Sequence, residues 1–335
     1  MKLITFKTRS NKKMPAFVGP LMAVVVLAII LTLTTERFLS ITNIMNILRQ
    51  TSLNALIALG MLMVMLTGGI DLSVGSTAVL SGCVMGVMLK AGVASDIVLI
   101  LAGLATGVLC GGLNAILFTQ LELPHPFVST MGTRMMFRGL ALFITGAAPI
   151  AGFSSGILFL GYSNILSVIP ACFLLVIIFY LIISLFLNKI ALGRKIYSVG
   201  GNREAARLSG INVKRTLNFS YIMSGLMASV AGIVLLGRIS SASPIASETA
   251  DMDAIASCVV GGTSFLGGKG SVAGTLAGAM LIGVINNGLD LLGAQTDAKF
   301  LVVGLVIIGA VFLDVVRNKA EERSRRLAQA KAISE

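Results

Sequence analysis

The feature that most constrains this chain is a series of apolar runs with few or no charged residues, long enough to cross a lipid bilayer. A helix needs about 20 apolar residues to span about 30 Å of hydrocarbon. Only 12% of the 335 residues are charged, about half the share expected of a soluble domain. We therefore predict an all-α polytopic membrane protein with about ten transmembrane helices, some of them short or broken. The runs are Ala16–Thr34, Thr51–Thr67, Leu72–Leu89, Ile97–Thr119, Phe127–Ala147, Asn164–Leu187, Thr216–Gly237, Ala254–Gly268, Ser271–Leu292 and Thr296–Leu313.

The charged residues gather between these runs, and their signs predict the topology. Lys and Arg are enriched in the cytoplasmic loops of membrane proteins. Residues 1–15 and 315–335 are basic, and residues 188–215 hold seven Lys or Arg against one acid, Glu204. Ten crossings place these three segments in the cytoplasm and the acidic segment Ser240–Asp253 outside. We therefore predict one transmembrane domain over residues 1–335, with both termini cytoplasmic and no nucleic-acid partner.

The stretch MLTGGIDLSVGST, residues 65–77, interrupts the apolar sequence with three glycines, two serines and an acid. Ser73 is expected to cap the helix that follows, whose positive end favours Asp71. A similar pattern recurs at Gly261–Ser271. Non-helical backbone at membrane depth is tolerated only where it faces protein or water. We expect the break to lie against a translocation pathway or its inner gate, and a tight cytoplasmic turn between two spans is the alternative.

Polar side chains inside the apolar runs are the default functional candidates of a membrane protein. Arg134 and Arg138 share a helix face, and Arg138 lies deeper and needs a partner, for which Asp71 is a candidate. The residues expected to line a pathway are Asp71, Ser73, Asn114, Asn286, Asn287 and Asp290. The last three share one helix face by their spacing. They form either a polar stripe for a hydroxyl-rich solute or a set of interhelical hydrogen bonds.

No motif in the chain indicates bond-breaking chemistry. The stretch GGTSFLGGKGS resembles a phosphate-binding loop, but it lacks the first glycine and has Gly270 where the motif needs Ser or Thr. The one histidine, His125, lies in a loop between two prolines, and the four cysteines have no ligand-like spacing. We therefore expect no enzymatic activity, no metal and no cofactor.

The segment LGRKIYSVGGNREAARLSGINVKR, residues 192–215, predicts a short cytoplasmic helix. Asn202 can cap it, and Gly210 is placed to end it. A helix of about seven residues is marginal in water, so we expect it to dock on a soluble partner. A solvated basic loop on anionic lipid headgroups is the alternative. The residues expected to make the contact are Gly201, Asn202, Arg203, Glu204, Ala205, Ala206, Arg207, Leu208 and Gly210.

Four stretches in a fixed order resemble the membrane permeases of bacterial ABC importers for ribose-type monosaccharides. They are ILRQTSLNALIALGM, TGGIDLSVGS, GRKIYSVGGNREAARLSGINVKR and DAIASCVVGGTSFLGGKGSVAGTLAGAMLIGVINNGL, and the similarity runs from about Phe38 to Asp314. The resemblance implies two permease subunits, identical or different, around one pathway in the bacterial inner membrane. It also implies a cytoplasmic ATP-binding subunit docked on Gly200–Gly210.

The same resemblance implies a periplasmic sugar-binding protein. Glu248, Asp251 and Asp253 of the acidic outer segment are expected to contact it. The family pattern has Asn where this chain has Asp290, so the particular sugar stays open.

Two functions of other classes are weaker readings. A secondary transporter driven by an ion gradient needs buried titratable relays, and this chain offers only Asp71, Asp290 and Arg138. A membrane anchor for a soluble complex needs neither a polar stripe nor broken helices. The sequence therefore predicts import by alternating access, driven by ATP hydrolysis on a partner chain. This chain supplies the pathway, whose two states bind the partners differently.

Overall fold

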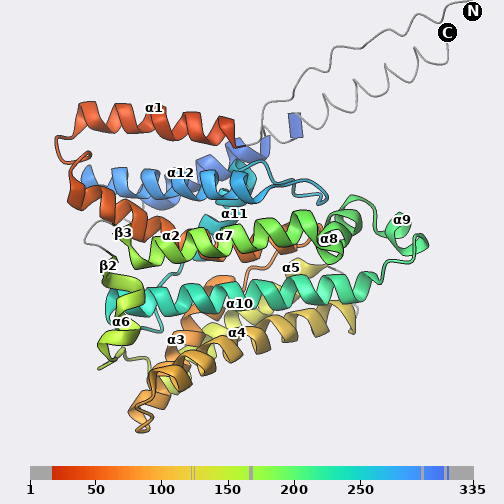
Figure 1. Ribbon diagram of the computed structural model, residues 1–335, viewed down its shortest axis with the longest axis horizontal. Coiled ribbons are helices and arrows are strands. Elements are labelled where there is room, and N and C mark those ends of the chain that lie inside the picture. The colour runs from red at the N-terminus through yellow and green to blue at the C-terminus, as the bar shows by residue number, and fades with distance from the viewer. Residues whose placement is uncertain are drawn as a thin grey trace, which may run out of the picture.

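The computed structural model describes residues 17–121, 123, 125–165, 169–295, 298–312 and 315–316. The predicted all-α class is confirmed, since the structure is 77% helical and contains 13 helices within these ranges. Figure 1 shows the long helices side by side along one axis, with α6, β2 and β3 at one end of the bundle and α8 and α9 at the other. We call these the β2 end and the α9 end.

The helices are α1 Val18–Thr34, α2 Ile41–Leu66, α3 Val74–Lys90, α4 Asp96–Thr119, α5 Pro126–Thr145, α6 Ser155–Tyr162, α7 Ala171–Lys189, α8 Ala191–Gly201, α9 Arg203–Leu208, α10 Val213–Ile239, α11 Ala250–Val260 and α12 Val272–Leu291. A further apolar helix, Ala298–Phe312, follows α12. The strands form two short antiparallel pairs: β1 Ile150–Ala151 with β4 Ser241–Ala242, and β2 Asn164–Ile165 with β3 Ile169–Pro170.

Five of the described helices, α2, α4, α7, α10 and α12, are long and apolar enough to cross a membrane. The run Ala254–Gly268, expected as a span or a partial one, is at most a partial one, because α11 has 11 residues and ends at Val260. The predicted run Asn164–Leu187 begins as a β-hairpin, and its helix starts only at Ala171. The sequence did not predict α6, α8 or the strand pairs.

The backbone before α11 crosses part of the bundle without forming a helix. A Cβ added at Gly86 of α3 would lie 2.9 Å from Ala242, and one added at Gly75 would lie 3.5 Å from the Cβ of Ala250. The chain therefore follows α3 over the 11 residues from Gly86 to Gly75, about 16 Å. The 11 residues of α11 add about 16 Å. Together the non-helical part and α11 match about one bilayer thickness in length.

Gly103, Gly107 and Gly111 recur at every fourth residue, a spacing that predicts close approach of a second helix, and the structure confirms it. A Cβ added at Gly107 of α4 would lie 2.3 Å from the carbonyl oxygen of Gly225 in α10, and one at Gly111 would lie 2.3 Å from that of Tyr221. In the same way, Gly278 of α12 lies against the carbonyl of Ser257 in α11. Small residues allow two helix backbones to meet where lipid supplies no hydrophobic drive. These contacts place α10 and α2 in the centre, where they are the most buried of the five long helices.

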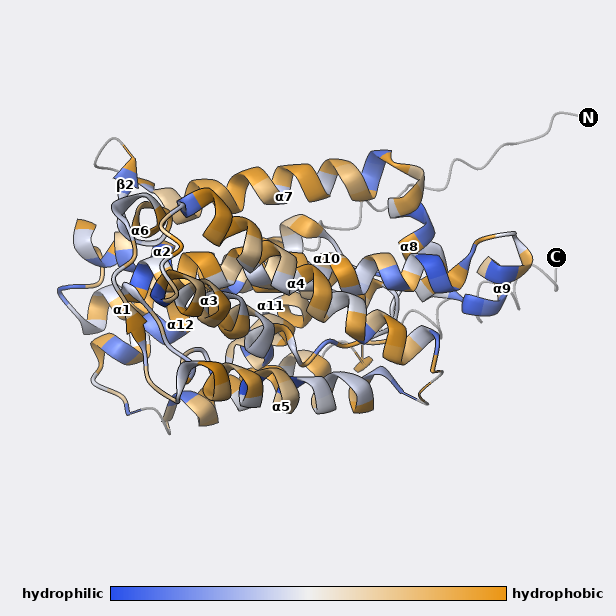
Figure 2. Ribbon diagram, turned by 90° about the horizontal axis from the view of Figure 1, so that it is seen from below, coloured by the Kyte–Doolittle hydropathy of each residue, from blue (hydrophilic) through white to orange (hydrophobic). Residues whose placement is uncertain are grey.

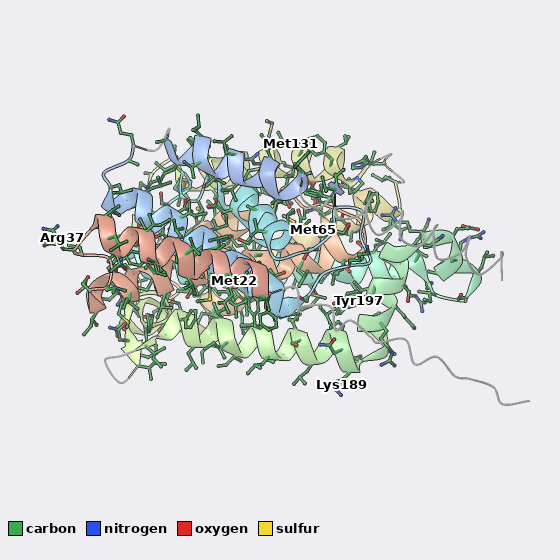
Figure 3. The ribbon with its side chains drawn as sticks, turned by 90° about the horizontal axis from the view of Figure 1, so that it is seen from above. Met22, Arg37, Met65, Met131, Lys189 and Tyr197 are labelled. Carbon is green, nitrogen blue, oxygen red and sulfur yellow. The ribbon has the colours of Figure 1, made fainter. Side chains whose placement is uncertain are left out.

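The outer surface of the bundle is apolar. Leu33 of α1 and Phe143 of α5 are 82% and 84% exposed, and similar side chains cover α4 and α7. Figure 2 shows the apolar colour along the long helices and the hydrophilic colour concentrated near the two ends, including α9. In Figure 3 Arg37 lies at one end of the bundle, and Lys189 lies toward the other. An apolar belt between two polar ends matches a bilayer, in which a hydrocarbon core lies between two polar headgroup layers.

Candidate functional site

A cavity of about 570 Å³ lies between α2, α5, α12, the helix Ala298–Phe312 and the chain that enters α11. Its wall combines charged, amide and hydroxyl groups with an apolar side. The lining residues are Gln50, Arg134, Glu248, Thr249, Met252, Asp253, Asn286, Lys299, Phe300, Val303, Gly304 and Ile307. Cavities of this size and mixture are typical of small-molecule sites. We call it the large chamber.

A second cavity of about 150 Å³ lies against the large chamber and shares four lining residues with it: Gln50, Thr249, Asp253 and Asn286. It continues toward the centre of the bundle. Its other lining residues are Leu53, Asn54, Arg238, Ser247, Ala250 and Gly283. We call it the small chamber. Together the two chambers form a space between the helices that can accept a solute.

Ion pairs neutralise the two cations that line the large chamber. Arg134 pairs with Asp251, with 3.1 Å between Nε and Oδ2, and the Asp251 side chain is buried behind the wall. Lys299 pairs with Asp290 at the junction of α12 and the last helix. Two further acids, Glu248 and Asp253, also line the chamber. The large chamber therefore presents no net positive field to a solute and disfavours an anion.

The three polar residues predicted on one face of α12 face different surroundings. Asn286 lines both chambers. Asn287 is buried and exchanges two hydrogen bonds with Asn43 of α2, at 2.9 and 3.0 Å. Asp290 is part of the Lys299 ion pair. The stripe and the interhelical hydrogen bonds are therefore both present, on different residues.

Three predicted pathway residues, Asp71, Ser73 and Asn114, are brought together, but in the core and not at either chamber. Asp71 is 1% exposed. Its Oδ1 accepts hydrogen bonds from the Ser73 backbone NH, the Ser73 hydroxyl and the Asn114 amide, at 3.0, 2.7 and 3.3 Å. Its Oδ2 accepts one from the Ser224 hydroxyl of α10, at 2.9 Å. The predicted cap by Ser73 is wrong, because its side chain turns to Asp71 and makes no capping hydrogen bond.

Asp71, Ser73, Asn114 and Ser224 form a cluster that joins the non-helical stretch before α3 to α4 and α10. Every neighbour donates a hydrogen bond to Asp71. A carboxylate, which only accepts hydrogen bonds, therefore suits this site. We expect Asp71→Ala to lower the free energy of unfolding by about 3 kcal/mol, because it leaves several buried donors without an acceptor. Thermal unfolding of the purified chain in detergent measures this loss. Asp71→Asn keeps the shape and one acceptor, so we expect about half the effect. Equal melting temperatures for Asp71→Ala and wild type would contradict this role.

Arg138 finds its partners on the extended chain and not at Asp71. Its Nη1 donates to the carbonyl oxygens of Pro244 and Ala246, at 2.7 and 2.8 Å, and Nη2 donates to that of Ser247 at 3.5 Å. The neighbouring Arg134 donates to the carbonyl of Glu248 at 3.3 Å. Carbonyls outside a helix need such donors at membrane depth. The two arginines therefore hold the non-helical backbone that forms the chamber wall.

Three glycine segments meet at the α9 end. A Cβ added at Gly200 of α8 would lie 1.7 Å from the carbonyl oxygen of Leu66, at the end of α2. The Gly268 NH donates to that same oxygen at 2.9 Å. A Cβ added at Gly267 would lie 2.6 Å from the backbone nitrogen of Gly68. The two similar glycine-rich interruptions predicted from the sequence, residues 65–77 and Gly261–Ser271, thus lie together against the end of α8. We call this contact the glycine junction.

The predicted short helix is confirmed as α9, with six residues. The Asn202 side chain caps it by accepting from the Ala205 NH at 2.9 Å, and Gly210 follows it with a φ of 78°. Arg203 lies over the Phe118 ring and donates to the Thr67 carbonyl. Gly201, which ends α8, adjoins this cap, and Glu204 and Arg207 form an exposed ion pair.

One face of α9 is buried and the other is free. Ala206 is buried with Val199, Leu217 and Tyr221, whereas Ala205 and Leu208 are exposed. Leu208 is 76% exposed. The helix is therefore anchored to the bundle by one side, and Leu208 lies on the exposed side.

The acids predicted to contact a binding protein lie at the large chamber. Glu248 and Asp253 line it, and Asp251 is buried behind Arg134. Sequence reasoning missed Gln50, Asn54, Arg238 and Lys299, which also line the chambers. Gln50 and Asn54 are four residues apart on α2 and so share a helix face, a spacing that could have revealed them.

An apolar bundle with a cavity that carries polar groups between its helices and a short exposed helix at one end has the properties of a membrane permease. The chain belongs to the family described as "Branched-chain amino acid transport system / permease component", whose model matches residues 43–311. It is 40% identical to the ribose import permease protein of Bacillus subtilis (strain 168) over 88% of this chain and 92% of the relative. No solved structure matches the chain.

Two further relatives extend the comparison. The chain is 38% identical to the D-allose transport system permease protein of Escherichia coli (strain K12), over 88% of this chain and 90% of the relative. It is 36% identical to the fructose import permease protein of Rhizobium meliloti, over 83% and 79%. The predicted resemblance to permeases of monosaccharide importers is confirmed. The chain is therefore a multi-pass membrane permease component of a transport system.

Proposed function

We propose that the chain is the permease subunit of an ABC importer and that its chambers conduct a monosaccharide such as ribose, allose or fructose across the bacterial inner membrane. The observation that carries the proposal is the cavity lined by paired ions, carboxylates, amides and hydroxyls inside an otherwise apolar bundle. Amide and hydroxyl groups in such a cavity suit a neutral solute rich in hydroxyls. The named relatives import sugars of this class.

The proposed partners follow from the ends of the bundle. The α9 end faces the cytoplasm and docks the ATP-binding subunit through Gly201–Gly210, and the opposite end faces the periplasmic sugar-binding protein. The basic segment 188–215 and the exposed Leu208 support this orientation. Both termini are then cytoplasmic, although residues 1–15 and 317–335 lie outside the described ranges. A second permease subunit completes the pathway.

The glycine junction supplies a route from the ATP-binding subunit to the pathway. Movement of α9 acts on Gly200, which touches Leu66 and Gly268 directly. Leu66 ends α2, which carries the chamber residues Gln50 and Asn54, and the loop of Gly268 joins α11 to α12, which carry Asp253 and Asn286. The ATP-driven step therefore reaches both walls of the small chamber through rigid helices.

The transport reaction itself tests the proposal. We expect proteoliposomes that contain the chain to take up radiolabelled sugar only when ATP, the ATP-binding subunit and the sugar-binding protein are present. Uptake driven by a sodium or proton gradient with the chain alone would instead identify a secondary transporter.

Removing the exposed ion pair of α9 tests the docking face. The Arg207 hydrogen bond lowers the pKa of the Glu204 carboxyl, so the pair stays ionised at neutral pH. We expect Glu204→Ala combined with Arg207→Ala to leave insertion and thermal stability unchanged, because exposed ion pairs stabilise little. Co-purification of the ATP-binding subunit and sugar uptake should fall at least tenfold. Lys189→Ala, at the end of α7, is the matched control for loss of a basic charge. Unchanged co-purification would contradict docking at α9.

A further inference from the structure

The small chamber collects polar groups from four helices. Gln50 and Asn54 come from α2, Arg238 from α10, Asp253 from α11 and Asn286 from α12. Its volume of about 150 Å³ equals about five water molecules in the liquid. The space therefore matches one sugar ring.

Asn54 carries an unused acceptor in this wall. Its side chain is 91% buried, being 9% exposed. Its Nδ2 donates to the Ser257 hydroxyl at 2.8 Å, whereas Oδ1 has no hydrogen-bond partner in the described structure. Ser257 in turn donates to the Asp253 carbonyl at 2.7 Å, so the orientation of the amide is fixed. A buried acceptor without a donor costs about 1–3 kcal/mol, and a ligand hydroxyl in the chamber would supply the missing donor.

Arg238 and Asp253 supply the complementary groups. Among the described residues, no hydrogen bond or ion pair is made by the Arg238 guanidinium, which offers five donors. The Asp253 carboxylate interacts with Asn286 and Thr249, both of which also line the chamber. A sugar hydroxyl donates one hydrogen bond and accepts others. Adjacent hydroxyls on one ring therefore match an acceptor at Asn54 and Asp253 together with a donor at Arg238.

We propose that the small chamber is a selective binding site, here called the seat, for a single monosaccharide. The permease itself then discriminates between sugars by their hydroxyls. The inference deepens the proposed function and rests on it. Sites built to bond a substrate hydroxyl reject analogues that lack it, because the buried polar groups are then left unpaired. Glu248 and Lys299 of the large chamber lie outside this seat and are part of the approach to it.

Direct binding to the full-length chain in lipid nanodiscs tests the seat without any partner protein. Radiolabelled D-ribose, D-allose and D-fructose are the probes, with 2-deoxy-D-ribose and maltose as competitors. We expect saturable binding of at least one labelled sugar, at least tenfold weaker competition by the deoxy sugar, and none by maltose. Asn54→Leu should weaken binding about tenfold, the equivalent of one hydrogen bond of about 1.4 kcal/mol.

The stability of the same variants separates a ligand seat from a structural role. Asn54→Leu removes the unpaired acceptor while Ser257 keeps its bond to Asp253, so we expect an equal or higher melting temperature together with the weaker binding. Asp253→Asn is a second, isosteric variant that should also weaken binding. Asn188→Leu, on the exposed end of α7, is the matched control and should bind as wild type does.

Two results would overturn the seat and leave the proposed function standing. One is ATP-dependent transport with no saturable binding of any labelled sugar to the chain alone. The other is transport whose preference for ribose over 2-deoxyribose is unchanged by both Asn54→Leu and Asp253→Asn. Failure of ATP-dependent transport in the wild-type complex would instead remove the proposed function.

Discussion

Arg138→Leu should lower the free energy of unfolding by about 4 kcal/mol. The guanidinium donates to three backbone carbonyls of the non-helical segment at Pro244, Ala246 and Ser247. These hydrogen bonds are partly buried, and a hydrogen bond from a charged donor contributes about 1.5–3 kcal/mol. Leucine keeps the apolar volume of the side chain, so the loss reports the hydrogen bonds.

The unfolding midpoint of the purified chain in detergent measures this effect. Arg138→Lys is the informative second variant. The lysine ammonium is a compact point charge, so it can donate to fewer of the three carbonyls than the guanidinium does. We expect it to recover part of the lost stability. Since the extended segment also carries the chamber residues Ser247 and Thr249, Arg138→Leu should abolish transport even at temperatures where the variant is folded. A wild-type midpoint for Arg138→Leu would show that the segment is held by other contacts.

Gly200→Val should reduce sugar uptake at least 100-fold. Its Cβ would lie 1.7 Å from the Leu66 carbonyl oxygen and 2.6 Å from the Gly268 nitrogen. Both are backbone atoms, so no side chain can turn aside to make room. The end of α8 must therefore move away from both breaks, which disconnects α9 from the helices that carry the chambers.

The measurement compares ATP hydrolysis with sugar uptake in reconstituted complexes. We expect Gly200→Val to retain binding of the ATP-binding subunit and its basal hydrolysis, while stimulation by the loaded binding protein and uptake are lost. Gly112→Ala is the matched control, because a Cβ at that helix position meets nothing within 4 Å. Normal uptake by Gly200→Val would show that the glycine junction does not transmit the movement.

The sequence predicted the architecture more fully than the contacts of the polar residues. The apolar runs, the GxxxG steps of Gly103, Gly107 and Gly111, and α9 with its Asn202 cap all have counterparts in the structure. These features follow from local rules, namely hydrophobic length, glycine spacing and capping chemistry. The predicted cap by Ser73 failed because a carboxylate two residues earlier competes for its hydroxyl.

The chamber walls were predicted only in part. Asn286, Glu248 and Asp253 were named as pathway or contact residues, whereas Asn54, Arg238 and Lys299 were not. Charged and amide groups on six segments reach the chambers, and no spacing within one segment reveals that convergence. The non-helical segment before α11 was expected outside the membrane, because its serines and acids are typical of a loop in water. Its contacts within the bundle depend on Arg138, which lies far away in the sequence.

The sequence by itself determined that this chain is an apolar helical bundle, where its helices lie along the chain, and which glycines allow close packing. Tertiary structure alone decided the partners of the buried polar groups. Arg138 bonds Ala246 108 residues away, Asp71 bonds Ser224 153 residues away, and Asn43 bonds Asn287 244 residues away. A polar group in lipid must find a partner, but which partner depends on helix rotation and depth, which packing fixes only when the whole bundle is assembled.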